Sequence, residues 1–405
     1  MSPPGNPQPT TQPATLPMLL LMVVLNVIGF GVVIPLLPYF ANAFDAPPWQ
    51  VALMFATYSA GQFAGELLWG PVSDHVGRRP VLLITTLGMA VFTLALAFAP
   101  GIGIAILLRL GAGFFAGNMS VIQSYIVDVS PPERLAARLG YIGSAFGIGF
   151  VVGPAVGGLM AHPEMGSLGF RPPLILAAAL AALAAVGMLA FVRESRSGLR
   201  TAGQRRSPFA ALGEALGDPV LAPTFAAIVL SFFAFSGLWA VLGLWGDAKF
   251  GWSAREFGLV MAATGLAAAV TQGLLTATLM RWIGAGPTIA VSLVLAGLAF
   301  AFMGLSPWGW LAIIFLNLAM MGHAGAQPAC SALVSRSASA DRQGETLGAA
   351  SAVGSLARVF GPIAGGALYS GIRPDAPIVL AGLAMLPAAW MGWKAGRAYL
   401  ARTLQ

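Results

Sequence analysis

Four ionisable side chains lie inside long apolar stretches of this sequence, where an uncompensated charge is costly. They are Glu66, Arg109, His323 and Arg358. A carboxyl group removed from water protonates more readily, which suits a group that takes up and releases a proton. Charged side chains within an apolar span face a partner or a water-filled cavity, and they mark a functional site by default. The sequence therefore predicts a proton or substrate pathway lined by these residues.

Each of these residues also has a plainer interpretation, and the sequence leaves both open. Glu66 either carries the proton or belongs to a charged latch at one end of the molecule. Arg109 acts in substrate binding or proton coupling, or it makes a structural hydrogen bond, with Asn26 as the expected partner at a similar depth. His323 either carries a proton or packs as a neutral side chain. The substrate cavity is predicted to include Asn26, Arg109, His323 and Arg358.

The composition identifies the surroundings that these charges must avoid. Of 405 residues, 58% are hydrophobic and only 9% are charged, whereas a soluble domain carries about 25% charged residues. Apolar windows of about 20 residues, each enough to cross a bilayer, recur along the chain. We therefore predict an all-α polytopic membrane protein with the lipid bilayer as its partner. The net charge of +7 then reflects basic loops rather than a nucleic-acid partner.

Apolar windows between polar, proline and glycine breaks predict twelve transmembrane helices in two groups of six. A first bundle is expected over 17–192 and a second over 221–396. They are joined by a cytoplasmic linker, 193–220, and flanked by a disordered cytoplasmic tail, 1–16, and a second tail, 397–405. The predicted helices are 17–40, 50–71, 80–99, 101–127, 135–160, 171–192, 221–246, 255–280, 286–306, 308–335, 344–370 and 376–396.

The positions of Lys and Arg predict the orientation. With the N-terminus inside, fifteen of them fall in cytoplasmic loops and the C-terminal tail, and four fall on the other side. Basic residues concentrate on the cytoplasmic side of membrane proteins. Both termini are therefore expected in the cytoplasm.

An internal repeat supports the division into two halves. Residues 116–160 align without gaps on 324–368, and ten of the 45 positions are identical, including both Gly-Pro and both Gly-Gly pairs. Duplicated halves of this kind build secondary transporters whose substrate site lies between the halves. We therefore expect two pseudo-symmetric six-helix bundles.

Small residues form a stripe along the fifth predicted helix. Ala145, Gly149, Gly153 and Gly157 are four positions apart, so a neighbouring helix can approach closely. Pro154 removes one backbone donor and should bend the helix. The stripe is either ordinary helix packing or a functional contact at the interface between the halves.

Four motifs resemble those of the major facilitator superfamily, in order and at the expected spacing. The glycines from 140 to 158 resemble its antiporter motif, motif C. The segment "GPVSDHVGRRP" (70–80) resembles motif A, and "RLGAG" (109–113) resembles motif B. The segment "GFGVVIPLLP" (29–38) resembles a proline motif of the family. The chain is most similar to twelve-helix drug:proton antiporters, and the "SDHVGRRPVLL" segment to tetracycline exporters in particular.

The resemblance implies roles for two groups of residues. In motif C, the helix seals the outward side of the inward-facing state through Gly149, Gly153, Pro154, Gly157 and Gly158. In motif A, a cytoplasmic latch breaks when the halves rock: Asp74 faces the N-terminus of the helix at 344–370, and Arg78 pairs with Asp128. The motif A latch comprises Gly70, Asp74, Gly77, Arg78, Arg79 and Asp128.

The chain departs from tetracycline exporters at two positions where these carry aspartate. Asn26 and Phe92 stand there instead, so neither position can carry the proton. The remaining intramembrane charges are biased positive, which predicts an anionic or zwitterionic substrate rather than a cationic drug.

Together these features predict a secondary transporter and exclude other classes. Neither Lys249 nor Lys394 lies in a GxxxxGK phosphate-binding sequence, so ATP does not drive this chain directly. No metal, cofactor or enzymatic activity is expected. The predicted function is export of a small amphipathic, drug-like molecule in exchange for protons, by a monomer in the bacterial inner membrane. The alternative is proton-coupled or facilitated transport of a small anionic metabolite.

Overall fold

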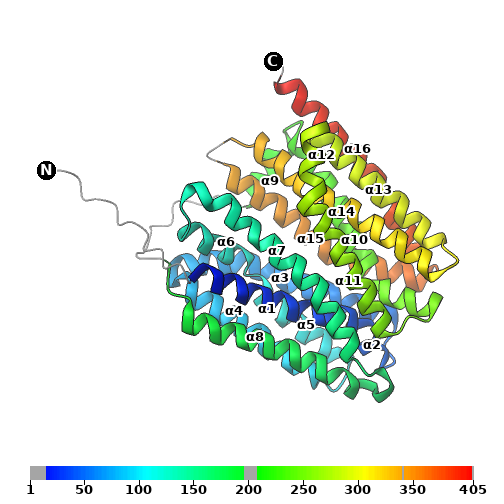
Figure 1. The fold of residues 1–405 in the computed structure, drawn as a ribbon. Coiled ribbons are helices and arrows are strands. Elements are labelled where there is room, and N and C mark those ends of the chain that lie inside the picture. The colour runs from blue at the N-terminus through cyan, green and yellow to red at the C-terminus, as the bar shows by residue number, and fades with distance from the viewer. Residues whose placement is uncertain (1–14, 196–207, 340–341, 404–405) are drawn as a thin grey trace.

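Long helices make up nearly all of the computed structural model, which describes residues 15–195, 208–339 and 342–403 (Figure 1). In these ranges, eleven helical stretches are long and apolar enough to cross a membrane. The remaining predicted span, α3 (Pro48–Val76), is equally long but carries Gln62 and Glu66 along its length. The predicted N-terminal tail up to residue 14 and the middle of the predicted linker lie outside the described residues.

The first six spans form one bundle, in which α1 packs on α7 and α8, α3 on α5, and α4 on α8. Their bounds are α1 (Thr15–Val33), η1 (Ile34–Leu36) and α2 (Leu37–Asn42) for the first; α3 (Pro48–Val76); α4 (Arg78–Ala97); α5 (Ile102–Ala116) and α6 (Met119–Asp128); α7 (Pro132–Met160); and η2 (Pro163–Phe170) with α8 (Arg171–Phe191).

The second six spans form the other bundle, in which α10 packs on α15 and α16, and α13 on α14 and α16. Their bounds are α10 (Leu221–Phe250); α11 (Ala254–Val270), η3 (Thr271–Leu275) and α12 (Thr276–Ile283); α13 (Ala285–Leu305); α14 (Gly309–Ser337); α15 (Gln343–Gly371); and α16 (Ala376–Thr403). The two halves lie side by side, blue to green against green to red (Figure 1).

Helix boundaries follow local chemistry. Pro48 and Pro132 stand in the first turn of α3 and α7, where the missing N–H of proline has no cost. Gly77 and Gly284 end their helices with φ angles of 108° and 85°, which side chains of L-residues rarely adopt. Ser253 starts α11 with a capping box completed by the residue three positions later. These residues fix where each span enters and leaves the membrane.

Several predicted spans are interrupted or extended. The fourth breaks at Gly117 and Asn118 between α5 and α6, and the eighth contains a π-helical turn, η3. The predicted linker contains a helix, α9 (Pro208–Leu216), and the predicted C-terminal tail is helical to Thr403 as the end of α16. Apolar windows register length and polarity, so they do not predict local backbone breaks or the continuation of a helix beyond its apolar part.

The bundles meet along two seams, one between α7 and α11 and the other between α3 and α15. We call the end of the molecule where α8 ends and α10 begins the linker end, and the opposite end the distal end. At the distal end the hydroxyl of Tyr39 donates a 2.7 Å hydrogen bond to the carbonyl of Trp252 in the other half. Close contacts of Gly158 with Gly258 and of Gly366 with Ala52 also lie toward this end, so both seams are closed there.

Candidate functional site

The glycine stripe of α7 faces α1, within the first bundle. A Cβ atom added at Gly153 would lie 2.7 Å from the Cα of Gly31 and 2.7 Å from the carbonyl oxygen of Ile28. Cβ atoms at Gly149 and Gly157 would likewise collide with residues of α1. Glycine is therefore required along this stripe because the α1 backbone lies directly against it.

The seam with the second bundle is formed by the adjacent face of α7. A Cβ at Gly158 would lie 2.6 Å from the carbonyl oxygen of Ala254, and one at Gly258 would lie 2.5 Å from that of Pro154. The expectation that the stripe itself lies at the interface between the halves was therefore wrong. Neighbouring positions on a helix point about 100° apart, so Gly157 and Gly158 serve different interfaces.

The repeat gives α15 the same two kinds of contact, one within its bundle and one with the other bundle. A Cβ at Gly365 would lie 2.9 Å from the Cα of Gly237 in α10, which is the partner of α15 within its own bundle. At Gly366 the added Cβ would lie 2.5 Å from the Cβ of Ala52 in α3, which belongs to the first bundle. The two Gly-Gly pairs thus each join one contact within a bundle to one contact between bundles.

Glu66 lies at the α3–α15 seam and is bonded to the other bundle. The hydroxyl of Ser355 donates a 2.8 Å hydrogen bond to Oε2 of Glu66, and Nη2 of Arg358 donates a 2.8 Å hydrogen bond to the same hydroxyl. Arg358 also acts on Glu66 electrostatically. The predicted carboxylate and one predicted arginine therefore form a relay, Arg358–Ser355–Glu66, between the bundles. Ser355 was missed because only the packed structure shows which way α15 faces.

An aromatic cluster surrounds the second-bundle side of this relay. The guanidinium of Arg358 lies 4.9 Å from the ring centroid of Phe232, within cation–π range. His323 is stacked on Phe235, with centroids 4.0 Å apart and planes at 3°. The His323 ring is 5% exposed, and its Nδ1 has no hydrogen-bond partner among the described residues. The structure therefore brings Arg358 and His323 to one cluster through the α10 aromatics.

Arg109 lies in the first bundle, away from this cluster. Its guanidinium carbon is 4.1 Å from the ring centroid of Tyr58, and Nε has no hydrogen-bond partner in the described part of the chain. Asn26 and Arg109 both belong to the described residues, and the structure has no hydrogen bond between them. The expectation that Asn26 is the partner of Arg109 was therefore wrong. The reason is packing, because α5 lies against α3, where Gly113 meets the backbone of Tyr58.

The motif A residues form a charged network at the linker end of the first bundle. Nη1 of Arg78 lies 2.8 Å from Oδ1 of Asp74, and Nε of Arg78 lies 3.3 Å from Oδ2 of Asp128, which is the predicted pair. Arg78 is 6% exposed and also donates to the hydroxyl of Ser73 at 2.5 Å. The predicted contact of Asp74 with the first turn of α15 stays a prediction.

Glu194 completes this network, although none of the sequence motifs includes it. Its Oε1 accepts a 2.9 Å hydrogen bond from the backbone N–H of Arg78, and its Oε2 accepts one of 3.1 Å from that of Arg79. A carboxylate at the first N–H groups of α4 also has a favourable interaction with the helix dipole. A Cβ at Gly77 would lie 2.5 Å from this carboxylate. The end of α8 is thereby fastened to the start of α4.

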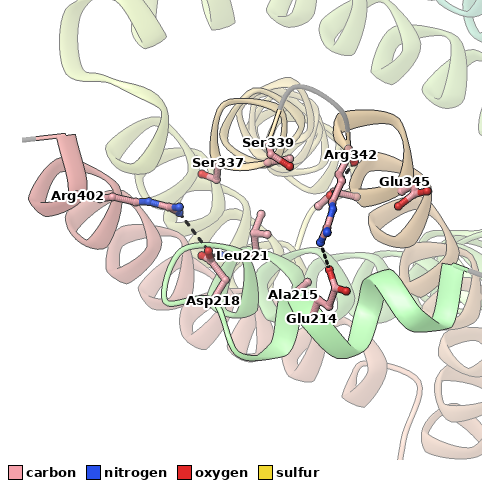
Figure 2. A pocket seen from close by; sticks show the side chains of 11 residues that line it. Glu214, Ala215, Asp218, Leu221, Ser337, Ser339, Arg342, Glu345 and Arg402 are labelled. Atoms are coloured by element: carbon pink, nitrogen blue, oxygen red, sulfur yellow. Dashed lines mark hydrogen bonds and ion pairs between the residues drawn. The ribbon is translucent and has the colours of Figure 1, made fainter. Parts of the chain in front are cut away.

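A small cavity at the linker end of the second bundle is closed by ion pairs (Figure 2). Arg342 lies 2.6 Å from Glu214 of α9, and Arg402 lies 3.1 Å from Asp218. These ion pairs connect the segment of α9 to α15 and α16 around a cavity of about 240 Å³.

Two pseudo-symmetric bundles with charged groups held at their interface are typical of secondary membrane transporters. The family model of the Major Facilitator Superfamily matches residues 19–362 and 247–399. The chain belongs to this superfamily.

Curated relatives of this chain are drug-resistance proteins by name. It is 30% identical over 378 residues to the tetracycline resistance protein, class G, of Vibrio anguillarum, covering 91% of this chain and 90% of that protein. It is 29% identical over 358 residues to the class C protein of Escherichia coli, covering 85% and 87%. It is 26% identical over 368 residues to multidrug resistance protein 2 of Bacillus subtilis, covering 89% of each.

Solved structures share the fold. A bacterial homologue of the human lysosomal transporter Spinster, inward-facing and unoccupied, superposes with a TM-score of 0.81 at 18% identity over 96% of this chain and 98% of that one. The human organic anion transporter TETRAN gives 0.72 at 23% identity, over 95% and 100%. The predicted fold, twelve spans in two pseudo-symmetric bundles, is thus confirmed.

Proposed function

We propose that this protein exports a small amphipathic, drug-like molecule in exchange for protons by alternating access, and that Glu66 carries the proton. The observation that carries the proposal is the hydrogen-bonded relay from Arg358 through Ser355 to Glu66, which links the two bundles. The similarity of this chain to proteins named for tetracycline and multidrug resistance supports the export of drug-like molecules.

The relay couples the charge of Glu66 to the contact between the bundles. An ionised Glu66 accepts the hydrogen bond of Ser355 and attracts Arg358, so the α3–α15 seam is held together. A proton on Glu66 removes the negative charge, which weakens both interactions. The bundles can then separate at this seam, and release of the proton on the other side restores the contact.

The closed distal seams indicate which state is present. The positive-inside rule supports a cytoplasmic linker end, because most of the basic residues lie there. With the Tyr39–Trp252 hydrogen bond and the Gly158–Gly258 contact closing the distal end, we assign the inward-facing state. The transport unit that we propose is the monomer, in the bacterial inner membrane, since one chain supplies both bundles.

The remaining predicted residues take supporting roles in this proposal. The motif A network around Arg78 and Asp128 acts as the cytoplasmic latch, and the α7 face at Gly158 seals the outer side. Arg109 and His323 lie on opposite sides of the interface as candidate substrate contacts. The negative charge of Glu66 offsets the positive charge of Arg358. Arg109 therefore gives the described intramembrane residues a net positive charge.

The test is a measurement of proton movement in everted vesicles that contain the protein. A panel of drugs that includes tetracycline is added while a pH-sensitive dye reports the internal pH. We expect at least one drug to release protons from the vesicles in the wild type, and an uncoupler to abolish drug accumulation. Drug accumulation that persists with the uncoupler would contradict proton exchange.

A further inference from the structure

The two seams between the bundles are equivalent by the internal repeat, but they differ in charge. Glu66 follows the first residue of α3, Pro48, by 18 positions; Gln272 follows the first residue of α11, Ala254, by 18 positions. A neutral amide therefore occupies, on the α7–α11 seam, the place that the carboxylate occupies on the α3–α15 seam.

The partner helix shows the same difference. At the repeat offset of 208, Gly147 of α7 corresponds to Ser355 of α15, and Phe150 corresponds to Arg358. The hydroxyl and the guanidinium of the relay are thus replaced by a hydrogen atom and an apolar ring. One seam is bridged by a charged relay, whereas the other carries no such charges, and Gly147 leaves open the space that the Ser355 side chain occupies in its counterpart.

A cavity of about 610 Å³ occupies the α7–α11 seam, between α7, the π-helical turn η3 and Pro328 of α14. Its α7 wall begins at Gly140 and ends at Val152. At 1.5 Å per residue these lie about 12 Å and about 30 Å along α7 from the linker end. Because α7 has 29 residues and is about 43 Å long, the cavity lies at bilayer depth and spans the middle of the helix.

Exposed apolar side chains of membrane-spanning helices line part of the cavity, and its lining is neutral. Ile148, Val152 and Leu266 line it and are 49%, 38% and 56% exposed on membrane-spanning helices. The lining includes the hydroxyl of Ser144 and the amide of Gln272, and none of the lining residues carries a charge. The volume falls in the range of pockets that hold drug-sized ligands. A π turn within an α-helical span is also a frequent feature of functional sites.

We propose that this cavity binds an amphipathic molecule that has an apolar body and an uncharged hydrogen-bonding group, and that the molecule enters from the bilayer. The proposal rests on the export function proposed above and names the substrate class and its route. The apolar body contacts Ile148, Val152 and Leu266, and the polar group bonds to Gln272 or Ser144. The charged relay on the opposite seam remains free to exchange protons.

Binding can be tested without transport. A bimane fluorophore is attached to Gly140→Cys, and in a control protein to Leu159→Cys, which lies on α7 outside the cavity. The native Cys330 is 2% exposed and does not compete for the label. In lipid nanodiscs, TEMPO laurate should quench the first reporter with a saturable curve and the second only in proportion to its concentration. Proportional quenching of both reporters would overturn the proposal.

Two further variants show whether the binding is in the cavity. A Cβ at Gly143 meets no atom within 4 Å, so Gly143→Trp can fill the cavity without disturbing the helix. Gln272→Glu keeps the size of the side chain but adds a charge that disfavours a neutral ligand. Each change should weaken the saturable quenching by about tenfold or more, whereas Leu159→Trp should not. Unchanged quenching in both variants would overturn the assignment.

The two proposals fail in different ways. If drugs move protons in vesicles but quenching is only proportional to concentration, the export function is supported and the proposed binding site in the cavity is wrong. If quenching is saturable but no drug moves protons, the export function falls and the cavity loses its role in it. A drug that moves protons should also displace TEMPO laurate, and failure to displace it would contradict the shared route.

Discussion

Ser355 and Glu66 are 289 positions apart in the sequence, and the hydroxyl of one donates a 2.8 Å hydrogen bond to the carboxylate of the other across the two bundles. Arg358 donates to the same hydroxyl from one turn further along α15. The titratable group of α3 is thus tied to the element that must move relative to it. A change of charge on Glu66 therefore changes a contact between bundles directly.

Replacing Ser355 by alanine should slow proton-driven transport by about tenfold, because a hydrogen bond to a charged group contributes about 1.5–3 kcal/mol. The measurement is the initial rate of drug uptake into everted vesicles under an imposed pH gradient. Ser351→Ala is the matched control, since Ser351 is an exposed serine on the same helix. Equal rates for the two variants would show that the relay does not couple the proton to transport.

Leucine at Gly158 and at Gly153 should have different consequences. Gly158 meets α11 of the other bundle, so Gly158→Leu should abolish transport by holding the distal seam apart. Gly153 meets Gly31 within the first bundle, so Gly153→Leu should mainly lower the thermal unfolding temperature. Purified variants are compared by tryptophan fluorescence during heating and by transport in vesicles.

Gly103→Leu is the control for both, because Gly103 lies on α5 and the space around it is open. It should keep the unfolding temperature and retain transport within a factor of about two. If Gly158→Leu transports at the rate of this control, the distal seam does not have to close against α11.

Glu194→Gln should lower the unfolding temperature, because the carboxylate accepts hydrogen bonds from the first N–H groups of α4. An anion at a helix N-terminus contributes about 0.3–1 kcal/mol, and the loss should be of that size. Glu164→Gln serves as control, since Glu164 is an exposed carboxylate in the short helix η2 at the distal end. A loss no larger than in the control would exclude Glu194 as a structural part of the motif A network.

Asp375 should stabilise the distal end of the second bundle in a pH-dependent way. Burial opposes its ionisation, but hydrogen bonds from Trp245 and Lys249 outweigh this and hold the pKa of the carboxyl below its ordinary value of 3.8. A lowered pKa means that the stabilisation is complete above that value and is lost as the pH falls through the pKa of the folded protein.

At pH 7, Asp375→Asn should therefore unfold about 2 °C below the wild type, and the difference should shrink below about pH 3.8. Asp247→Asn is the control, because Asp247 is exposed on the turn of α10 next to this cluster. A difference that stays constant as the pH falls would mean that the charge of Asp375 contributes nothing.

The sequence could predict the number of spans, their grouping and the depth of the charges, because these depend on apolar length and on the repeat. It could also predict the pairing of Arg78 with Asp128, since both flank short loops at one end. The facing of side chains within the interface could not be predicted. Gly157 and Gly158 are neighbours in sequence, yet only the packed helices show that one meets α1 and the other meets α11.

The repeat contained more information than its glycines indicate. Phe150 and Arg358 occupy equivalent positions, so the contact of α7 with α11 near Phe150 predicts that Arg358 faces α3. Such an inference requires the structure of one seam before the other can be assigned. The breaks at Gly117 and at η3 had no such counterpart, because each occurs in only one half.

The central claim is that Glu66 carries the proton, and comparison of two transport modes in one set of proteoliposomes tests it most directly. Wild type and Glu66→Gln are measured for exchange of labelled against unlabelled drug without a pH gradient, and for accumulation driven by a pH gradient. We predict that Glu66→Gln retains exchange and loses accumulation driven by the gradient. Accumulation by Glu66→Gln at the wild-type level would contradict the account, because another group would then carry the proton.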